Sequence, residues 1–249
     1  MLSINTIKLI RSLEQKKFRK EHGLFVAEGK KAILELLKSD QFIIKYLFLT
    51  QESHIPFDIS QKIQAEIITD KELSRISSQN SPDFGLAVLE IPSEKAIALP
   101  EKNEFSIVLD SIRDPGNLGT IIRLCDWFGV KNIFCSDDTV DFYSPKVIQA
   151  SMGSFCRVNV HYTGLYDWLK SIRDTITIYG TTLNGALLNT VTPKKPAVIV
   201  IGSESHGISP EIEELLHEKI TIPSAQGVDT ESLNAATACS IVTWHFFNQ

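Results

Sequence analysis

The sequence lacks the motifs that mark the most common nucleotide-binding and hydrolytic α/β enzymes. It contains no Gly-x-x-x-x-Gly-Lys-Ser/Thr phosphate loop, no Gly-x-Gly-x-x-Gly segment after an apolar strand and no Gly-x-Ser-x-Gly turn. Because each motif supplies backbone or nucleophile geometry that its chemistry requires, nucleotide hydrolysis, ordinary dinucleotide binding and serine hydrolysis lose their usual support.

The sequence also has no long apolar run and no cysteine spacing that is typical of a metal site. No uncharged stretch approaches the roughly 18–20 residues that span a bilayer, and residues 1–5 show no basic segment leading into an apolar one. We therefore expect a soluble, cytoplasmic protein with no membrane partner. The cysteines show no Cys-x-x-Cys spacing and lie in apolar surroundings, which favours reduced, packed thiols and indicates no metal site: Cys125, Cys135, Cys156 and Cys239.

The excess of basic over acidic residues is concentrated in the N-terminal segment. The whole chain has a net charge of −5, yet residues 1–45 hold ten Lys and Arg against five acids, so that segment is +5 and the remainder is −10. A net acidic chain argues against indiscriminate coating of nucleic acid, whereas a local basic face suits a partner that is held at one place. A solvated amphipathic helix explains the same charges equally well.

The pattern of apolar residues predicts two α/β domains. Residues 3–90 alternate between helices, the first over Asn5–Lys17, and short strands. Prolines and charges then interrupt the periodicity, which predicts domains over 1–95 and 103–249 with a linker over 96–102. In the second domain strands alternate with helices, which indicates a largely parallel sheet covered on both faces, with ligands bound at the carboxyl ends of its strands.

The last predicted helix, Leu233–Phe247, is apolar nearly all round. A helix of that composition is expected to be buried in its domain or against a partner subunit.

Three loops combine glycine with polar side chains beside an apolar strand or helix. In the first, Asn117 is predicted to cap a helix whose Arg123 projects away from its apolar stripe. In the second, Glu204 lies between glycines that allow close approach of the backbone to a ligand. In the third, Ser232 and Asn234 precede the final helix. A surface arginine, a salt-bridging glutamate and plain N-caps remain alternative interpretations of these residues.

Taken together, these loops resemble the three motifs of the SpoU (TrmH) family of RNA 2′-O-ribose methyltransferases. The motifs are Asn117-x-Gly119-x-x-x-Arg123, Gly202-Ser203-Glu204-x-x-Gly207, and Ile222-Pro223 with Ser232-Leu233-Asn234. Each is weak alone, but the three occur in order and at suitable spacing. The resemblance covers residues 105–249. Residues 4–90 also resemble the ribosomal-protein-like RNA-binding domain that many members carry.

The resemblance implies an α/β fold whose C-terminal chain threads a trefoil knot, with S-adenosylmethionine as the cofactor and a homodimer formed through the C-terminal domain. It implies these catalytic residues: Asn117, Arg123, Glu204, Ser232 and Asn234. It implies these cofactor-binding residues: Gly202, Ser203, Glu204, Gly207, Ile222, Ser224 and Leu233. The candidate RNA contacts are Lys8, Arg11, Lys16, Lys17 and Arg19.

Ser224 departs from the family pattern, because members commonly have an apolar residue such as methionine there. Arg123 is expected to position the ribose hydroxyl or the adjacent phosphate, since a side chain with a pKa above about 12 is a poor base at neutral pH.

The resulting hypothesis is S-adenosylmethionine-dependent 2′-O-methylation of a ribose in structured RNA, with ribosomal RNA favoured over transfer RNA as the partner. The alternatives are a transfer-RNA 2′-O-methyltransferase, a non-catalytic RNA-binding or assembly factor that retains the fold, and a doubly wound dehydrogenase.

Overall fold

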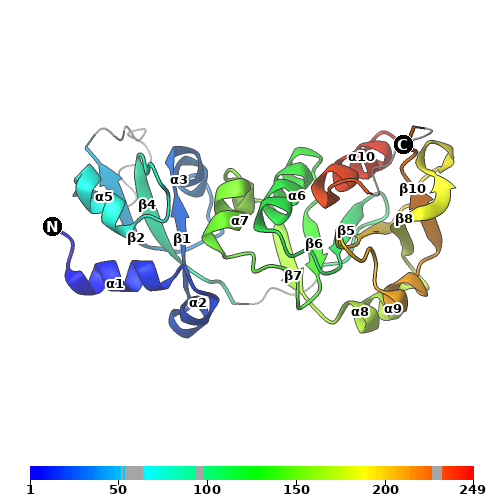
Figure 1. Ribbon diagram of the computed structural model, residues 1–249, viewed down its shortest axis with the longest axis horizontal. Helices are drawn as coiled ribbons and strands as arrows, with labels where there is room; N and C mark the ends of the chain where they lie inside the picture. The colour runs from blue at the N-terminus through cyan, green and yellow to red at the C-terminus, as the bar shows by residue number, and fades with distance from the viewer. Residues whose placement is uncertain (52, 54–63, 94–97, 226–231) are drawn as a thin grey trace. The chain divides into compact units, whose positions relative to one another are not determined.

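The computed structural model describes residues 1–51, 53, 64–93, 98–225 and 232–249, and these form two compact units (Figure 1). One unit comprises Met1–Lys95 together with Asp141–Arg157. The other comprises Ala96–Val140 and Val158–Gln249.

The first unit is built on a four-stranded sheet of order β1-β4-β2-β3. β4 runs antiparallel to both β1 and β2, while β3 is parallel to β2. Its elements are α1 (Ile4–Ser12), α2 (Lys16–His22), β1 (Leu24–Glu28), α3 (Lys30–Leu36), β2 (Ile44–Thr50), β3 (Glu66–Ile68), α5 (Asp70–Ile76), β4 (Gly85–Glu90), α7 (Pro145–Ala150) and the 3₁₀ helix η1 (Ser154–Cys156).

Alternating side chains of β1 reach both faces of this sheet. Leu24 and Val26 join a buried cluster with residues of α1 and α5, as expected when successive side chains of a strand point to opposite faces. On the other face Phe25, which is fully buried, packs its ring 4.9 Å from that of Tyr143 and 6.5 Å from that of Phe155. The first unit is therefore a three-layer arrangement with an aromatic cluster on one side.

The segment Asp141–Arg157 groups with the first unit, although the sequence pattern predicts it to be part of the second domain. Tyr143 and Phe155 are the reason, since burying large aromatic side chains is a strong driving force. The predicted domain boundary at residue 95 and the predicted linker over 96–102 stay predictions. Residues 96 and 97 of that linker lie outside the described residues.

The predicted single helix Asn5–Lys17 is wrong, because the chain forms two helices that are separated after Ser12. The interruption leaves backbone carbonyls near Leu13 available to a side chain from α2. The Arg19 guanidinium donates to the carbonyl oxygens of Leu13 and Glu14, each at 2.8 Å. The break between the helices thus has a specific polar partner, which helical periodicity could not indicate.

Arg19 is also a correction to the predicted RNA contacts. Its residue is only 3% exposed, and its Nε and Nη2 atoms donate to Asp141 Oδ2 at 3.0 and 2.5 Å. A buried guanidinium that makes four hydrogen bonds within the protein is not available to a phosphate group. Its function is structural.

Replacing Arg19 with methionine is expected to lower the free energy of unfolding by about 3 kcal/mol, because the change leaves the partly buried Asp141 carboxylate without its guanidinium partner. Lys20→Met, on the exposed side of the same helix, is the matched control and is expected to change stability by less than about 0.5 kcal/mol. Urea unfolding monitored by circular dichroism measures both. Equal unfolding midpoints for Arg19→Met and the wild type would contradict the structural assignment.

The second unit is built on a six-stranded sheet of order β10-β8-β9-β5-β6-β7, in which every neighbouring pair is parallel. This confirms the predicted parallel α/β fold class. Its elements are β5 (Phe105–Leu109), α6 (Pro115–Trp127), β6 (Asn132–Cys135), β7 (Asn159–Tyr162), α8 (Leu165–Ile172), β8 (Thr177–Leu187), the 3₁₀ helix η2 (Leu188–Thr190), β9 (Ala197–Ile201), α9 (Pro210–Glu213), β10 (Glu218–Thr221) and α10 (Ala235–Phe247).

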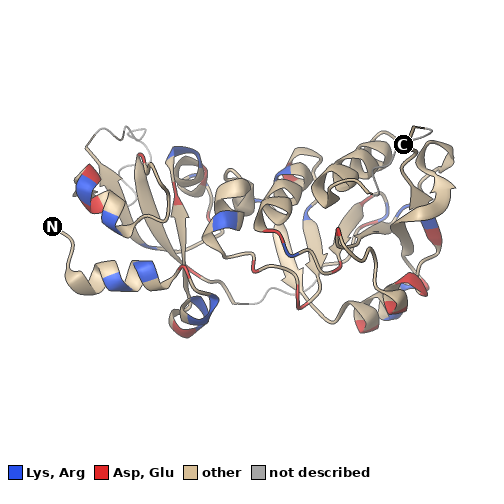
Figure 2. Ribbon diagram, viewed as in Figure 1, with Lys and Arg blue, Asp and Glu red and all other residues tan. Residues whose placement is uncertain are grey.

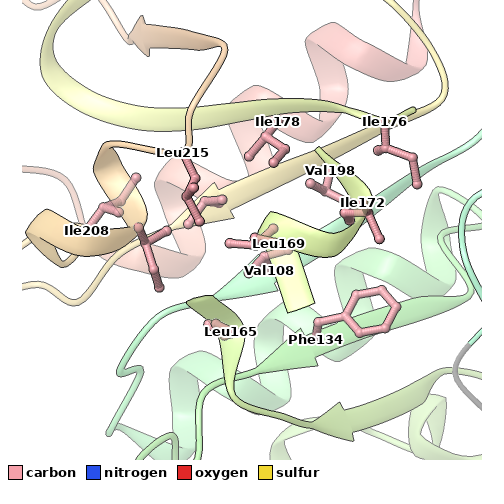
Figure 3. Close-up of a cluster of buried hydrophobic side chains, with 12 residues drawn as sticks. Val108, Phe134, Leu165, Leu169, Ile172, Ile176, Ile178, Val198, Ile208 and Leu215 are labelled. Carbon is pink, nitrogen blue, oxygen red and sulfur yellow. The ribbon is translucent and has the colours of Figure 1, made fainter. Parts of the chain in front are cut away.

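Helices cover both faces of this sheet, with α6 and α10 on one side and α8 and α9 on the other (Figure 1). Figure 3 shows the core on the α8 and α9 side, where Leu169 and Leu215 meet strand residues such as Val108 and Val198. The central strands β5 and β9 are buried along their entire length. Burial on both faces explains why they read as continuous apolar runs.

The four cysteines are buried in the structure, as predicted. Burial raises the pKa of Cys239 to about 12 and raises that of Cys125 well above its ordinary value. These thiols are therefore protonated at neutral pH and pack as small apolar groups.

The apolar helix α10 is only partly buried. Cys239 and Phe246 are fully buried, whereas Ile241, Trp244 and Phe247 are 37%, 57% and 52% exposed. One side of α10 thus covers the sheet and the other is open in the single chain. Within the described residues, no helix is both long enough and apolar enough to cross a bilayer.

Candidate active site

The first and second predicted loops leave neighbouring strands at the same edge of the large sheet. Leu109 of β5 lies beside Ile201 of β9 in the parallel register, and the Asp110 amide continues the ladder by donating to the Ile201 carbonyl oxygen at 2.9 Å. Carboxyl ends of parallel strands share one edge, which is where ligands bind in such sheets. The topology therefore brings the Asn117 and Glu204 loops together.

Asn117 does not cap α6, contrary to the sequence prediction. The N-cap is Asp114, whose Oδ1 accepts a hydrogen bond from the Asn117 amide at 2.8 Å, and Pro115 occupies the first helical position. This is the usual arrangement of an acidic N-cap followed by proline. Because Asp114 performs the capping, the Asn117 side chain is free to face the loops.

The Asn117 side chain joins the three predicted loops by hydrogen bonds. Its Nδ2 donates to Glu204 Oε1, and its Oδ1 accepts from Asn234 Nδ2 at 2.9 Å. Asn117 is only 9% exposed, so these bonds are partly shielded from water. Side chains separated by more than 85 positions in the chain thus form one continuous polar network, Glu204–Asn117–Asn234.

The start of α10 determines which atoms of this network donate hydrogen bonds and which accept them. Asn234 is the N-cap of that helix, and its Oδ1 accepts from the amides of Ala236 and Thr237 at 3.0 and 3.2 Å. With its oxygen occupied, Asn234 can present only its Nδ2 to Asn117. Asn117 must then accept with its oxygen and donate with its nitrogen, which delivers an N–H group to the Glu204 carboxylate.

The loop that carries Glu204 is closed by the backbone alone. Ser203 and Gly207 exchange two backbone hydrogen bonds of 3.0 and 2.9 Å, and Gly207 has a φ of +68°. A Cβ atom on Gly202 would lie 2.1 Å from the Gly207 carbonyl carbon and 2.3 Å from the Ile208 nitrogen. Only glycine at position 202 permits this close approach of two backbone segments.

Gly202→Ala is expected to lower the free energy of unfolding by about 1–3 kcal/mol, because its clash is with rigid backbone rather than a movable side chain. Gly164→Ala is the control, since no heavy atom lies within 4 Å of a Cβ built there. This variant is expected to lower the free energy of unfolding by less than about 1 kcal/mol. Denaturant unfolding of both variants measures the difference. A Gly202→Ala variant as stable as Gly164→Ala would show that the loop tolerates a Cβ atom.

Two acidic residues that organise the site were not among the predicted site residues. Asp114 caps α6, as described above. Asp110 is 4% exposed, and its Oδ2 accepts from the Ser209 amide at 2.7 Å, which anchors the chain that follows the Glu204 loop. Both have a signal in the sequence: Asp110 directly follows an apolar strand, and Asp114 directly precedes Pro115.

Five other predicted residues form no hydrogen bond with this network in the part of the chain that the structure describes: Arg123, Ile222, Ser224, Ser232 and Leu233. Arg123 lies on the exposed side of α6, and the described residues form no hydrogen bond or ion pair with its side chain. Ser232 and Ser224 are exposed, Leu233 is 44% exposed and Ile222 is partly buried. These side chains are therefore accessible to ligands but are not pre-assembled with Glu204.

The predicted basic residues of the first unit have different environments. Lys8, Lys16 and Lys17 are exposed and lie on α1 and α2, where Figure 2 shows blue segments. Arg11 is partly committed within the protein, since its Nη1 donates to the Ser77 carbonyl oxygen at 2.7 Å and to Glu14 Oε1 at 3.0 Å. The lysines are thus the most available cations of this set.

Two solved structures match the fold over the entire chain. An rRNA methyltransferase from Sinorhizobium meliloti, solved with AdoMet bound, is 28% identical, with a TM-score of 0.88 over 100% of this chain and 97% of that chain. A TrmH-family protein from Porphyromonas gingivalis is 34% identical, with a TM-score of 0.85 over 99% and 98% of the two chains. The fold and the site thus define a protein of the TrmH structural class.

Comparison at the sequence level identifies the family. The SpoU rRNA Methylase family model matches residues 104–244, and the MRM3-like substrate binding domain model matches residues 5–87. The 23S rRNA (guanosine(2553)-2′-O)-methyltransferase RlmP of Bacillus subtilis (strain 168) is 29% identical over 237 residues, covering 94% of this chain and 93% of its own length. The chain belongs to the SpoU rRNA Methylase family, which confirms the resemblance inferred from the three motifs.

Proposed function

We propose that this protein transfers a methyl group from S-adenosylmethionine to the 2′-hydroxyl of a ribose in ribosomal RNA. The observation that carries the proposal is the hydrogen-bonded network Glu204–Asn117–Asn234, which joins all three loops that resemble the family motifs. A relative that spans nearly the whole chain is named as a 23S rRNA 2′-O-methyltransferase, which favours ribosomal RNA over transfer RNA as the substrate.

The residues present fit an adenosine-type cofactor. Thr182 Oγ1 and Thr221 Oγ1, from the adjacent strands β8 and β10, are buried without a hydrogen-bond partner among the described residues, so they can serve polar ligand atoms. The residues that would hold the cofactor are Gly202, Ser203, Glu204, Gly207, Ile222, Ser224 and Leu233. When bound, S-adenosylmethionine supplies an electrophilic methyl group on a positively charged sulfur.

The protein's own residues are proposed to position the ribose rather than to form a covalent bond with it. Glu204, oriented by Asn117, would accept a hydrogen bond from a ribose hydroxyl, and Ser232 would donate or accept at the same sugar. Arg123 would neutralise the neighbouring phosphate and stabilise developing negative charge on the hydroxyl oxygen. Alignment of two reactants at about 3–3.5 Å supplies a large share of the acceleration in such reactions.

A homodimer through the second unit is part of the proposal. The exposed side of α10 presents Ile241, Trp244 and Phe247, and Trp127 at the end of α6 is 84% exposed. Helices α6 and α10 pack against each other, so these residues belong to neighbouring elements. An open apolar surface of this kind is typical of a subunit interface, and a second copy of this chain is the proposed partner.

The two parts of the chain are proposed to have separate tasks. Residues 1–95 would recruit structured RNA through Lys8, Lys16 and Lys17, and residues 103–249 would carry out the transfer. The buried protonated thiols suit the reducing conditions of a cytoplasmic location. A trefoil knot in the C-terminal chain remains a prediction from the family resemblance.

The decisive experiment incubates the full chain with isotopically labelled S-adenosylmethionine and with ribosomal or transfer RNA from cells that lack this protein. Nuclease digestion and mass spectrometry then locate labelled ribose. Label in one ribosomal RNA nucleotide is the expected result, and label in transfer RNA alone would replace ribosomal RNA as the substrate. RNA binding without any labelled ribose would favour the non-catalytic assembly factor.

A further inference from the structure

Two exposed ion pairs bridge the connections of strands β5 and β6 at opposite edges of the sheet. Before the strands, Lys131 Nζ lies 2.6 Å from Glu104 Oε1. After the strands, Arg113 Nη2 lies 3.3 Å from Asp138 Oδ2. The second pair lies at the edge that also carries the Glu204–Asn117–Asn234 network, because all three connections leave parallel strands at their carboxyl ends.

The carboxyl edge is acidic, and Arg113 is the exception. The connections leaving β5, β6 and β9, residues 110–114, 136–140 and 202–209, contain Arg113 as their only lysine or arginine. The acids in the same connections are Asp110, Asp114, Asp137, Asp138 and Glu204. Cations of this unit instead lie mainly in the connections that enter strands: Lys102, Lys131, Arg173, Lys194 and Lys195.

This distribution of charge is unfavourable for the approach of an RNA substrate. A polyanion that approaches the acidic edge is repelled unless a cation meets its phosphates there. Arg123, which is proposed to act at the reacting ribose and its phosphate, lies six residues after Asn117 on the same helix, about 9 Å further along the axis. A phosphate held at the strand ends therefore needs a second cation. Arg113, whose side chain is 78% exposed, is the cation nearest to the strand ends along the chain.

Asp138 is held independently of Arg113. Its Oδ1 accepts from Ser136 Oγ at 2.7 Å and from Ser111 Oγ at 3.0 Å. Although partial burial raises the pKa of Asp138, the hydrogen bonds from Ser136, Ser111 and Arg113 and the charge of Arg113 together hold it below its ordinary value. The carboxylate thus keeps two hydroxyl donors on its other oxygen when Arg113 moves away.

We infer that Arg113 contacts a phosphate of the RNA beside the nucleotide to be methylated, and that Asp138 is its partner only while RNA is absent. The inference rests on the proposed function. Exposed ion pairs contribute little to stability, whereas an arginine can form two charge-assisted hydrogen bonds with one phosphate. Exchange of Asp138 for phosphate is therefore favourable, and Arg113 acts as a positioning residue for the substrate.

The test compares Arg113→Ala with Lys131→Ala, which removes the cation of the matched pair at the opposite edge. Filter-binding assays measure the affinity of the full chain for protein-free ribosomal RNA from cells that lack this protein. The salt concentration is varied between 50 and 200 mM, a range over which phosphate contacts have large effects. Arg113→Ala is expected to raise the Kd about tenfold and to reduce the slope of log K against log salt by about 0.7–0.9, the value for one lost phosphate contact. Lys131→Ala is expected to match the wild type in both measurements.

Two further measurements distinguish a lost RNA contact from impaired folding or cofactor binding. Calorimetric titration with S-adenosylmethionine and the thermal midpoint are expected to be unchanged by Arg113→Ala, because the side chain is exposed. Asp138→Asn is expected to keep wild-type RNA affinity or better, since Arg113 is then free.

A wild-type Kd and salt slope for Arg113→Ala, or an equal loss for Lys131→Ala, would overturn the assignment of Arg113. A loss of affinity in Asp138→Asn as large as that in Arg113→Ala would overturn the assignment of Asp138 as a resting partner. If the wild type binds RNA through Arg113 but methylates no ribose, the proposed function fails and the RNA contact stands. If the wild type methylates RNA and Arg113→Ala binds it equally well, only this inference fails.

Discussion

Asn117→Asp is expected to slow methyl transfer by at least about 100-fold, the order of loss seen when a single oriented donor is removed from an active site. The substitution replaces the N–H group that meets Glu204 with an oxygen and places two carboxylates against each other. Two such groups cannot both be ionised at close range, so they share a proton and their apparent pKa rises. Glu204 then loses both its orientation and its full charge.

The pH dependence of this variant provides an internal check. A protonated carboxyl group at position 117 can donate to Glu204 as the Asn117 amide does, so the rate of the variant relative to the wild type is expected to rise as the pH falls through the raised pKa of the pair. Single-turnover rates with saturating cofactor and RNA measure this ratio. A ratio that is independent of pH would mean that the donor to Glu204 is not what the variant has lost.

Asn132→Asp is the matched control for Asn117→Asp. Asn132 is also a buried asparagine, 8% exposed, and its Oδ1 accepts from Asn159 Nδ2 at 3.3 Å, but it begins β6 at the opposite edge of the sheet. Its replacement is expected to cost stability while leaving the transfer rate of the folded protein within about threefold of wild type. If both variants lose activity equally, a general effect of burying a carboxylate would explain the result.

Arg123→Ala is expected to reduce the transfer rate by at least about 100-fold while leaving thermal stability and cofactor affinity unchanged. The stability expectation follows from the structure, since the Arg123 side chain is exposed and makes no hydrogen bond or ion pair with the described residues. The rate expectation follows from its proposed contact with the hydroxyl or adjacent phosphate. Arg123→Lys is expected to recover little activity, because lysine lacks the planar bidentate donor set.

Thr120→Ala is the control for Arg123→Ala, since Thr120 is an exposed residue one turn earlier on the same helix. Single-turnover kinetics, calorimetry with S-adenosylmethionine and thermal unfolding are measured on all three variants. Turnover by Arg123→Ala within about tenfold of the wild type, a loss of about 1.4 kcal/mol or less, would remove Arg123 from the mechanism. Loss of cofactor affinity in that variant would assign it to cofactor binding instead.

The parallel sheet of the second unit could be predicted because its central strands are buried on both faces. Burial of β5 and β9 requires continuous apolar runs, and the intervening helices supply a different period, so both signals are local. The break between α1 and α2 could not be predicted in this way. It depends on Arg19 and on carbonyl groups that become its partners only after folding.

The candidate site was predictable in part, for the same reason. Glycine beside a strand and asparagine before a helix are local signals, and the structure has a close backbone approach at Gly202 and the N-cap of α10 at Asn234. The hydrogen bonds of Asn117 to Glu204 and Asn234 span 87 and 117 positions, and no local pattern specifies such pairings. Arg19 and Asp141 are likewise far apart in the sequence, by 122 positions, so no local pattern could show that Arg19 is buried rather than available to RNA.

The sequence by itself determined the alternation of strands and helices, the family and the residue types available at three loops, because these properties follow from local periodicity and motif spacing. Only the tertiary structure decided which side chains meet: that Asp114 rather than Asn117 caps α6, that Asn117 orients Glu204, and that Asp141–Arg157 packs with the first unit. The physical reason is that hydrogen bonds and burial depend on distances in space. The order of the strands in the sheet sets these distances, and separation along the chain does not.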